Sequence, residues 1–144
     1  MKQGITLIEI LLVILLIIFL ALLIFPIGIS FYKNQQLQAH TQGILQTLRR
    51  AQLKAMGAEQ DSTFGVYITN GNYILFKGNS YASRDAQYDE IFDLPQIIIV
   101  QDAPKEIIFS KFEGKPNIAT DITMMSNGES ERININGLGR MSLQ

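Results

Sequence analysis

The sequence predicts an α+β protein in which one long N-terminal helix packs on a small antiparallel β-sheet. Three observations predict this class. Residues 10–29 carry no charge, the residues that follow repeat apolar side chains at helical spacing, and the pattern changes to alternation after Ser62. The chain has 144 residues. About 110 of them lie beyond the apolar run, which suits one small globular domain.

The apolar run at residues 10–29 is long enough to span a lipid bilayer. A hydrocarbon core about 30 Å thick needs roughly 20 apolar residues in a helix. A secretory signal has a shorter apolar region of about 7–15 residues, with a small-residue cleavage site behind it. Ser30-Phe31-Tyr32-Lys33 offers no such site, and the small residue Gly4 lies in front of the run instead. We therefore expect a retained transmembrane helix.

Glu9 interrupts a lipophilic stretch, because Leu7 and Ile8 precede it and Ile10 follows it. A carboxylate placed toward the centre of a bilayer costs on the order of 2.5–3.5 kcal/mol. Glu9 either lies at the level of the lipid headgroups or has a partner that offsets this cost.

The segment Gly4-Ile5-Thr6-Leu7-Ile8-Glu9 resembles the cleavage and methylation motif of the type IV pilin superfamily, which includes pilins, type II secretion pseudopilins and competence pseudopilins. The resemblance implies that prepilin peptidase cuts between Gly4 and Ile5 and methylates Ile5, where the family more often has Phe. It implies that Glu9 pairs with the N-terminal amine of a neighbouring subunit. It also places the chain in the cytoplasmic (inner) membrane as a single-pass protein, with its C-terminal domain outside the cytoplasm.

A long helix is predicted from residue 5 to residue 57, after a leader at residues 1–4. Pro26, at a position where many pilins have a proline, and Gly28 are expected to kink or loosen it. Its transmembrane part is residues 10–29 and its amphipathic part residues 30–57, ending at Gly57. The β-rich domain is residues 58–144. The apolar stripe of the amphipathic part is Leu37, Ile44, Leu45, Leu48, Ala51 and Ala55.

Residues after Ser62 alternate between apolar and polar side chains, which is typical of β-strands. Asn70-Gly71 and Asn127-Gly128 predict tight turns, and we expect positive φ at both residues of Asn70-Gly71. Residues 78–87 are polar and predict a surface loop, whereas residues 97–100 are expected to be fully buried. The predicted strands are residues 64–69, 73–76, 88–94, 96–101, 106–112, 121–125 and 132–136.

A second resemblance covers residues 106–140. Its motifs are Ile107-Ile108-Phe109, Glu113-Gly114-Lys115-Pro116 and the hairpin end Ile133-Asn134-Ile135-Asn136-Gly137-Leu138-Gly139-Arg140. These resemble the H-type minor pseudopilins, the related minor pilins of type IV pili and the competence pseudopilins. The resemblance implies a long helix on an antiparallel sheet and a minor, structural role in a filament.

Composition argues against several other classes. The net charge is −1, and loss of Lys2 with the leader would make it −2, whereas a broad nucleic-acid surface is normally basic. There are no cysteines, so the closing disulfide of many major pilins is ruled out. No catalytic constellation stands out, and we expect neither an enzyme nor a cofactor. His40, the single histidine, lies in a polar helical stretch and is expected to be solvated rather than a base or a ligand.

Asp85, Asp89, Glu90 and Asp93 form an acidic cluster in the sequence. Oxygen ligands suit calcium, but the spacing matches no known calcium loop, and a solvated strand face is the favoured interpretation. A zinc site would lack its usual cysteine and histidine ligands. We therefore expect no metal.

Two basic features remain. Arg49, Arg50 and Lys54 form a patch on the predicted helix, which serves solvation or packs against an acidic neighbour. Arg140 follows Gly139, and in some H-like minor pilins a basic C-terminal tail contacts DNA during uptake. One charge contributes little affinity for DNA, because affinity grows with the number of phosphates neutralised.

The resulting expectation is a minor pilin-like subunit of a type II secretion or type IV pilus filament. Its partners are other pilin or pseudopilin subunits, prepilin peptidase, the inner-membrane assembly platform and the lipid bilayer. The alternative is a competence subunit that binds DNA through Arg140. A third reading is an exported domain with a plain signal anchor and no filament.

Overall fold

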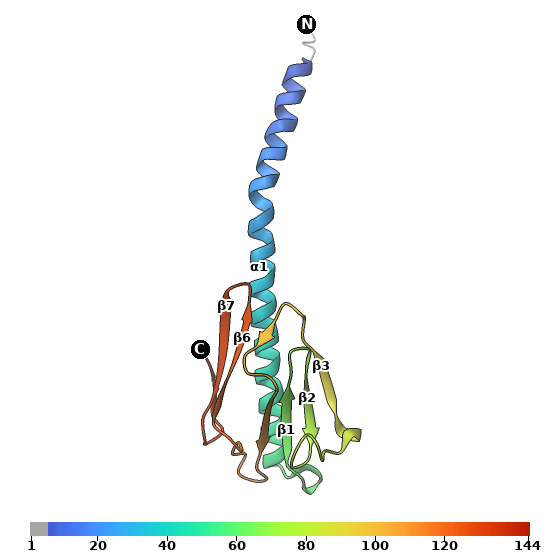
Figure 1. The fold of residues 1–144 in the computed structure, drawn as a ribbon, viewed down its shortest axis with the longest axis vertical. Helices are drawn as coiled ribbons and strands as arrows, with labels where there is room; N and C mark the ends of the chain where they lie inside the picture. Colours follow the sequence, from blue (N-terminus) through green and yellow to red (C-terminus); the bar gives the residue numbers. More distant parts are fainter. Residues whose placement is uncertain (1–5) are drawn as a thin grey trace.

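The computed structural model describes the backbone of residues 6–144, and their side chains apart from those of residues 23–31. One long helix, α1 (Leu7–Met56), accompanies two four-stranded antiparallel sheets. Figure 1 shows the N-terminal half of α1 projecting beyond the strands, while its C-terminal half lies against them. The predicted α+β class is confirmed, but the predicted single sheet is two sheets.

The first sheet has the strand order β3-β2-β1-β5, and every neighbouring pair is antiparallel. The short turn η1 (Glu59–Asp61) leads into this sheet from the end of α1, and η2 (Ala86–Tyr88) precedes β3. The strands are β1 (Phe64–Ile68), β2 (Asn72–Lys77), β3 (Glu90–Asp93) and β5 (Lys105–Phe109).

The second sheet has the order β4-β6-β7-β8 and is built around the predicted C-terminal hairpin. Asn127 and Gly128 form its turn with φ values of 52° and 85°, the positive values that a tight hairpin requires. The strands are β4 (Ile99–Val100), β6 (Thr120–Ser126), β7 (Glu129–Ile135) and β8 (Met141–Leu143).

The C-terminal half of α1 is amphipathic, as predicted. All six side chains assigned to its apolar stripe are buried, at 3% exposure or less: Leu37, Ile44, Leu45, Leu48, Ala51 and Ala55. The helix ends at the predicted residue, because Gly57 caps it and its N–H donates to the Leu53 carbonyl at 2.9 Å. Burial of this stripe, rather than intrinsic propensity, holds the helix in place.

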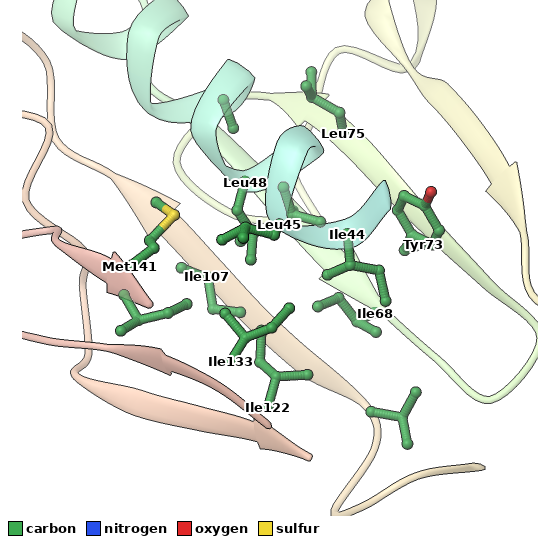
Figure 2. Packing of buried hydrophobic residues seen from close by; sticks show 14 of the residues in the cluster. Ile44, Leu45, Leu48, Ile68, Tyr73, Leu75, Ile107, Ile122, Ile133 and Met141 are labelled. Carbon is green, nitrogen blue, oxygen red and sulfur yellow. The ribbon is translucent and has the colours of Figure 1, made fainter. Parts of the chain in front are cut away.

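Both sheets pack on the same helix and form one core with it. Figure 2 shows Leu45 and Leu48 of α1 among side chains from strands of both sheets. Ile107 comes from the first sheet and Ile133 from the second, and both are fully buried. Complete burial of an aliphatic side chain of this size contributes about 1.5–3 kcal/mol.

The loop at residues 78–89 covers the outer face of the first sheet, so the predicted surface loop is ordered. The Tyr81 ring stacks on Tyr67 with 3.9 Å between ring centroids, and the Arg84 guanidinium lies over the other side of Tyr81. Beneath them Phe76 is fully buried. A Cβ atom at Gly65 would lie 2.6 Å from the Phe76 ring, so only glycine lets this ring settle on β1.

The turn between β1 and β2 differs from the prediction, because neither Asn70 nor Gly71 has positive φ. The Thr69 hydroxyl accepts hydrogen bonds from the backbone N–H groups of Gly71 at 3.3 Å and Asn72 at 3.2 Å. Because the Thr69 hydroxyl satisfies these two N–H groups, the turn does not need the predicted geometry with positive φ at both Asn70 and Gly71.

Two sheet edges are closed by asparagine side chains. Asn70 Oδ1 accepts the Val100 N–H of β4 at 2.8 Å, and Asn117 Oδ1 accepts the Ile108 N–H of β5 at 3.0 Å. Unpaired strand edges favour unwanted pairing with other chains, and each amide occupies one backbone N–H that would otherwise be open at such an edge.

The prediction that residues 97–100 are fully buried is wrong. Ile98 and Val100 are buried, at 1% and 2% exposure, but Ile97 and Ile99 are 40% and 58% exposed. The reason is that β4 is an edge strand with one face on the core and the other in solvent, so its side chains alternate.

Several predicted strands also differ in extent: the strand predicted at residues 96–101 is only β4, the strand predicted at residues 88–94 is only β3, and the strand predicted at residues 132–136 begins at Glu129. The strand predicted at residues 106–112 ends at Phe109, because Ser110 and Lys115 close a loop in which Phe112 has a φ of 66°. The end of the chain was not predicted to be regular, yet β8 pairs with β7.

Candidate assembly surface

The N-terminal half of α1 is an uncovered apolar surface. Every described side chain from Leu7 to Leu22 is exposed, with values between 48% and 83% for the large hydrophobic residues. Soluble monomeric proteins rarely expose apolar patches of more than a few hundred Å². This half of the helix therefore requires a covering environment.

Glu9 lies in the first turn of α1 and is exposed among these apolar residues, beside Ile10, Val13 and Ile14. Thr6 precedes the helix in an extended conformation, and its carbonyl accepts the Glu9 N–H at 3.1 Å. A carboxylate in the first helical turn is stabilised by the helix dipole. The geometry places one acidic side chain in the first turn of an exposed apolar helix.

Part of the predicted site lies outside the residues that the structure describes. Gly4 and Ile5, the predicted cleavage and methylation positions, lie outside the described residues. The backbone of α1 continues through Pro26 and Gly28 and curves gently in Figure 1, while the side chains of residues 23–31 lie outside the described set. Over the described side chains, no helix contains an apolar stretch long enough to cross a bilayer.

The predicted basic patch on α1 is paired within the chain. Arg50 forms an ion pair with Glu90 of β3, and Lys54 pairs with Glu59 of η1 at 3.1 Å. These pairs are solvent-exposed, where such interactions contribute about 0–1 kcal/mol. Arg49 is exposed on the same helix. Arg50 therefore links α1 to the first sheet and Lys54 links α1 to η1, so two of the three cations of the patch are paired within the chain.

The acidic segment near β3 is also largely neutralised by cations of the same chain. Asp89 pairs with Arg84 at 2.7 Å, and this hydrogen bond raises the pKa of Arg84 above its ordinary value. Asp85 lies 3.7 Å from Lys77. Among residues 6–144, no group of three or more His, Cys, Asp or Glu side chains could hold a metal ion. Asp93 is exposed at the end of β3, and His40 is half-buried on α1.

Gln52 is a structural residue that sequence reasoning missed. Its amide Nε2 donates to two backbone carbonyls, those of Gly114 and Gly139, each at 2.9 Å. These glycines belong to the two loop motifs that carry the second family resemblance. Gln52 therefore joins the C-terminal end of α1 to one loop from each sheet, an arrangement we call the Gln52 junction (Gln52, Gly114 and Gly139). In the sequence, only Gly114 and Gly139 pointed to this contact; nothing marked the glutamine.

The loop of residues 110–116 is held firmly against α1 by this junction. The Phe112 N–H donates to the Ala55 carbonyl at 3.1 Å, and Lys111 pairs with Asp61. The hydrogen bond from Lys111, together with its charge, lowers the pKa of Asp61.

Burial raises the pKa of Tyr73, whose ring stacks on Phe92 in the first sheet.

The chain matches no family model, no curated protein and no solved structure. Assignment of a function therefore rests on the residues and their geometry.

Arg140, the predicted DNA contact, lies between β7 and β8 and is exposed. Its N–H donates to Asn136 Oδ1 at 2.9 Å, and its carbonyl accepts the Asn136 N–H at 3.1 Å. The backbone at this position is therefore fixed in a closed loop, and the residues after Arg140 are paired in β8 instead of forming a free tail.

Proposed function

We propose that this chain is a minor pilin-like or pseudopilin subunit that builds or primes a type IV filament at the inner membrane, in type II secretion or type IV pilus assembly. The observation that carries the proposal is the uncovered apolar half of α1 with Glu9 at its start. Among the described residues, no group of three or more His, Cys, Asp or Glu side chains could hold a metal ion. The chain acts through assembly, not through chemistry.

The same apolar surface serves in two environments. In the membrane, lipid tails cover the helix, whose backbone groups are satisfied internally. In the filament, helices of other subunits replace the lipid, and close packing rather than hydrophobicity favours that exchange. Glu9 makes the exchange directional, because its charge is costly in lipid until a neighbour's N-terminal ammonium pairs with it.

Replacing Glu9 with leucine tests this role. Membrane insertion should be unchanged or improved, because the charge cost of about 2.5–3.5 kcal/mol is removed. Recovery in filaments should fall at least about a hundredfold, since a buried ion pair that loses one partner costs about 3–5 kcal/mol. The measurement compares carbonate-resistant membrane protein with the amount in sheared filaments. Glu9→Asp, which keeps the carboxylate, is the control, and normal filament recovery of the leucine variant would refute the role.

A second substitution tests processing separately. Gly4→Ala should block cleavage by prepilin peptidase, because the family motif has glycine before the scissile bond. Intact mass spectrometry should then find the residue 1–4 leader still attached and no added methyl group on Ile5. Gln3→Ala, one residue earlier, should leave the processed mass unchanged. A mature mass identical to wild type in Gly4→Ala would remove the cleavage assignment.

The alternative function, DNA binding during competence, has less support. Arg140 is a single cation in a closed loop, and Arg50 and Lys54 are paired with carboxylates. With a net charge of −1, the chain lacks the broad basic surface that phosphate contacts need.

A further inference from the structure

A small polar cleft lies between α1 and the hairpin of β6 and β7. Figure 1 shows the turn of this hairpin beside α1, at the level where the helix leaves the β-domain. The cleft has a volume of about 60 Å³, and a space of roughly 10–15 Å³ already holds one water molecule. It therefore has room for a small ion. The residues that line it are Asn34, Leu37, Gln38, Glu129, Ser130 and Glu131.

Glu129 and Glu131 lie on the face of the hairpin that packs against α1. They pair in register with Ser126 and Met124 of β6, and directly opposed residues of an antiparallel pair share one face of the sheet. Ser126 and Met124 are buried, and the Thr41 hydroxyl of α1 donates to the Met124 sulfur at 3.9 Å. Both carboxylates therefore belong to the helix-facing side, where the cleft is.

Neither carboxylate is neutralised by a cation within residues 6–144, because the ion pairs there involve other acidic side chains. Lys33 precedes Asn34 on α1 but forms no such pair, and Arg132 of β7 pairs with Asp121 at 3.8 Å. Two like charges on one face of one strand repel each other, and a bound cation offsets that repulsion.

Two neutral oxygen atoms beside the carboxylates are buried and have no hydrogen-bond partner among the described residues. One is Ser126 Oγ, on a residue that is 3% exposed and lies directly opposite Glu129 in the sheet. The other is Asn34 Oδ1, on a residue that lines the cleft from the helix side. A buried oxygen without a partner is unfavourable, so both atoms point to a ligand between α1 and the hairpin.

We propose that this cleft binds one divalent cation, and that Ca²⁺ is the ion its oxygens suit. Calcium takes six to eight oxygen ligands in a flexible geometry, from carboxylates, neutral oxygens and water. Glu129 and Glu131 supply the charge, Asn34 and Ser126 supply neutral oxygens, and water completes the shell. Two carboxylates make a weak site, so we expect a dissociation constant of about 0.1–1 mM, as in extracellular calcium modules.

The bound ion joins α1 to the β6–β7 hairpin. Asn34 comes from the helix and the other ligands from the hairpin, far away in the sequence, so no local motif marks the site. An ion that binds only the folded chain stabilises it by mass action. This inference goes beyond the proposed function and does not depend on a filament.

Titration calorimetry of the full-length chain in detergent tests the site, with calcium chloride added after a chelator has removed bound metal and has itself been dialysed away. We expect one ion per chain, and at least about tenfold weaker binding in Glu129→Gln and in Glu131→Gln, because calcium affinity depends on ligand charge. Ser126→Ala, which removes a neutral oxygen, should weaken binding by a smaller factor. Asp93→Asn, which removes an exposed carboxylate of β3, is the matched control and should bind like wild type.

Unchanged calcium affinity in both glutamine variants, or no binding up to about 10 mM calcium, would overturn the proposal. Loss of binding in Asp93→Asn alone would place the ion near β3 and would overturn it too. Thermal unfolding in calcium-free buffer checks the fold of each variant. Both glutamine variants should unfold at the same or a higher temperature than wild type, because a repulsion is removed. A lower temperature would show that the carboxylates support the fold directly, against the cation site.

Discussion

Replacing Gly139 with alanine should destabilise the β-domain by about 2–5 kcal/mol. Gly139 has a φ of 81°, a conformation that costs a residue with a Cβ about 1–2 kcal/mol. An added Cβ would also overlap the Gln52 amide and lie 2.5 Å from the Gly114 carbonyl oxygen. Forcing a methyl group into such a space costs typically about 1–3 kcal/mol. The Gln52 junction would open, and the free energy of urea unfolding should fall accordingly.

Gly128→Ala is the matched control for this prediction. Gly128 has a nearly identical φ of 85°, but nothing lies within 4 Å of an added Cβ. Its substitution should cost only the backbone part, about 1–2 kcal/mol. Equal losses of unfolding free energy in Gly139→Ala and Gly128→Ala would show that the close contacts with Gln52 and Gly114 do not add to the cost at Gly139. Adding Gln52→Ala to Gly139→Ala should recover part of the lost stability.

Leu48→Ala should destabilise the protein by about 2–5 kcal/mol, the range for removing a large aliphatic side chain from a packed core. Leu48 is fully buried between α1 and the sheets, and Figure 2 shows it near Ile107 and Leu45. Natural domains are stable by only about 5–15 kcal/mol, so this single change removes a large share. Chemical denaturation of the full chain, dispersed in detergent and followed by circular dichroism, measures the effect.

Leu53→Ala tests the same substitution on the same helix at a different degree of burial. Leu53 is 66% exposed, so its truncation should change stability by no more than about 0.5 kcal/mol. Both variants alter helix propensity by a similar amount, and the difference therefore reports packing alone. Similar losses at both positions would contradict the assignment of Leu48 to the core.

The long helix, its inward stripe and most strand positions follow from the sequence alone. Leu37, Ile44 and Leu48 repeat at helical spacing, and the strands alternate, because amphipathic elements must hide one face from water. Glu9 is also evident from sequence, since a lone carboxylate in an apolar run is unusual in any fold. These are local signals, carried by residues close together in the chain.

Tertiary structure decided what depends on residues far apart. In the sequence, nothing distinguishes Gln52 from the other glutamines of the helix. In the structure, it hydrogen-bonds the carbonyls of Gly114 and Gly139, which lie 62 and 87 residues later in the chain. The Thr69 hydroxyl replaced the expected turn geometry, and the division into two sheets placed Ile97 and Ile99 in solvent. Contacts between residues far apart in the chain, such as strand pairing and hydrogen bonds across loops, leave no periodic pattern in the sequence. The tertiary structure therefore decides which side chains make them.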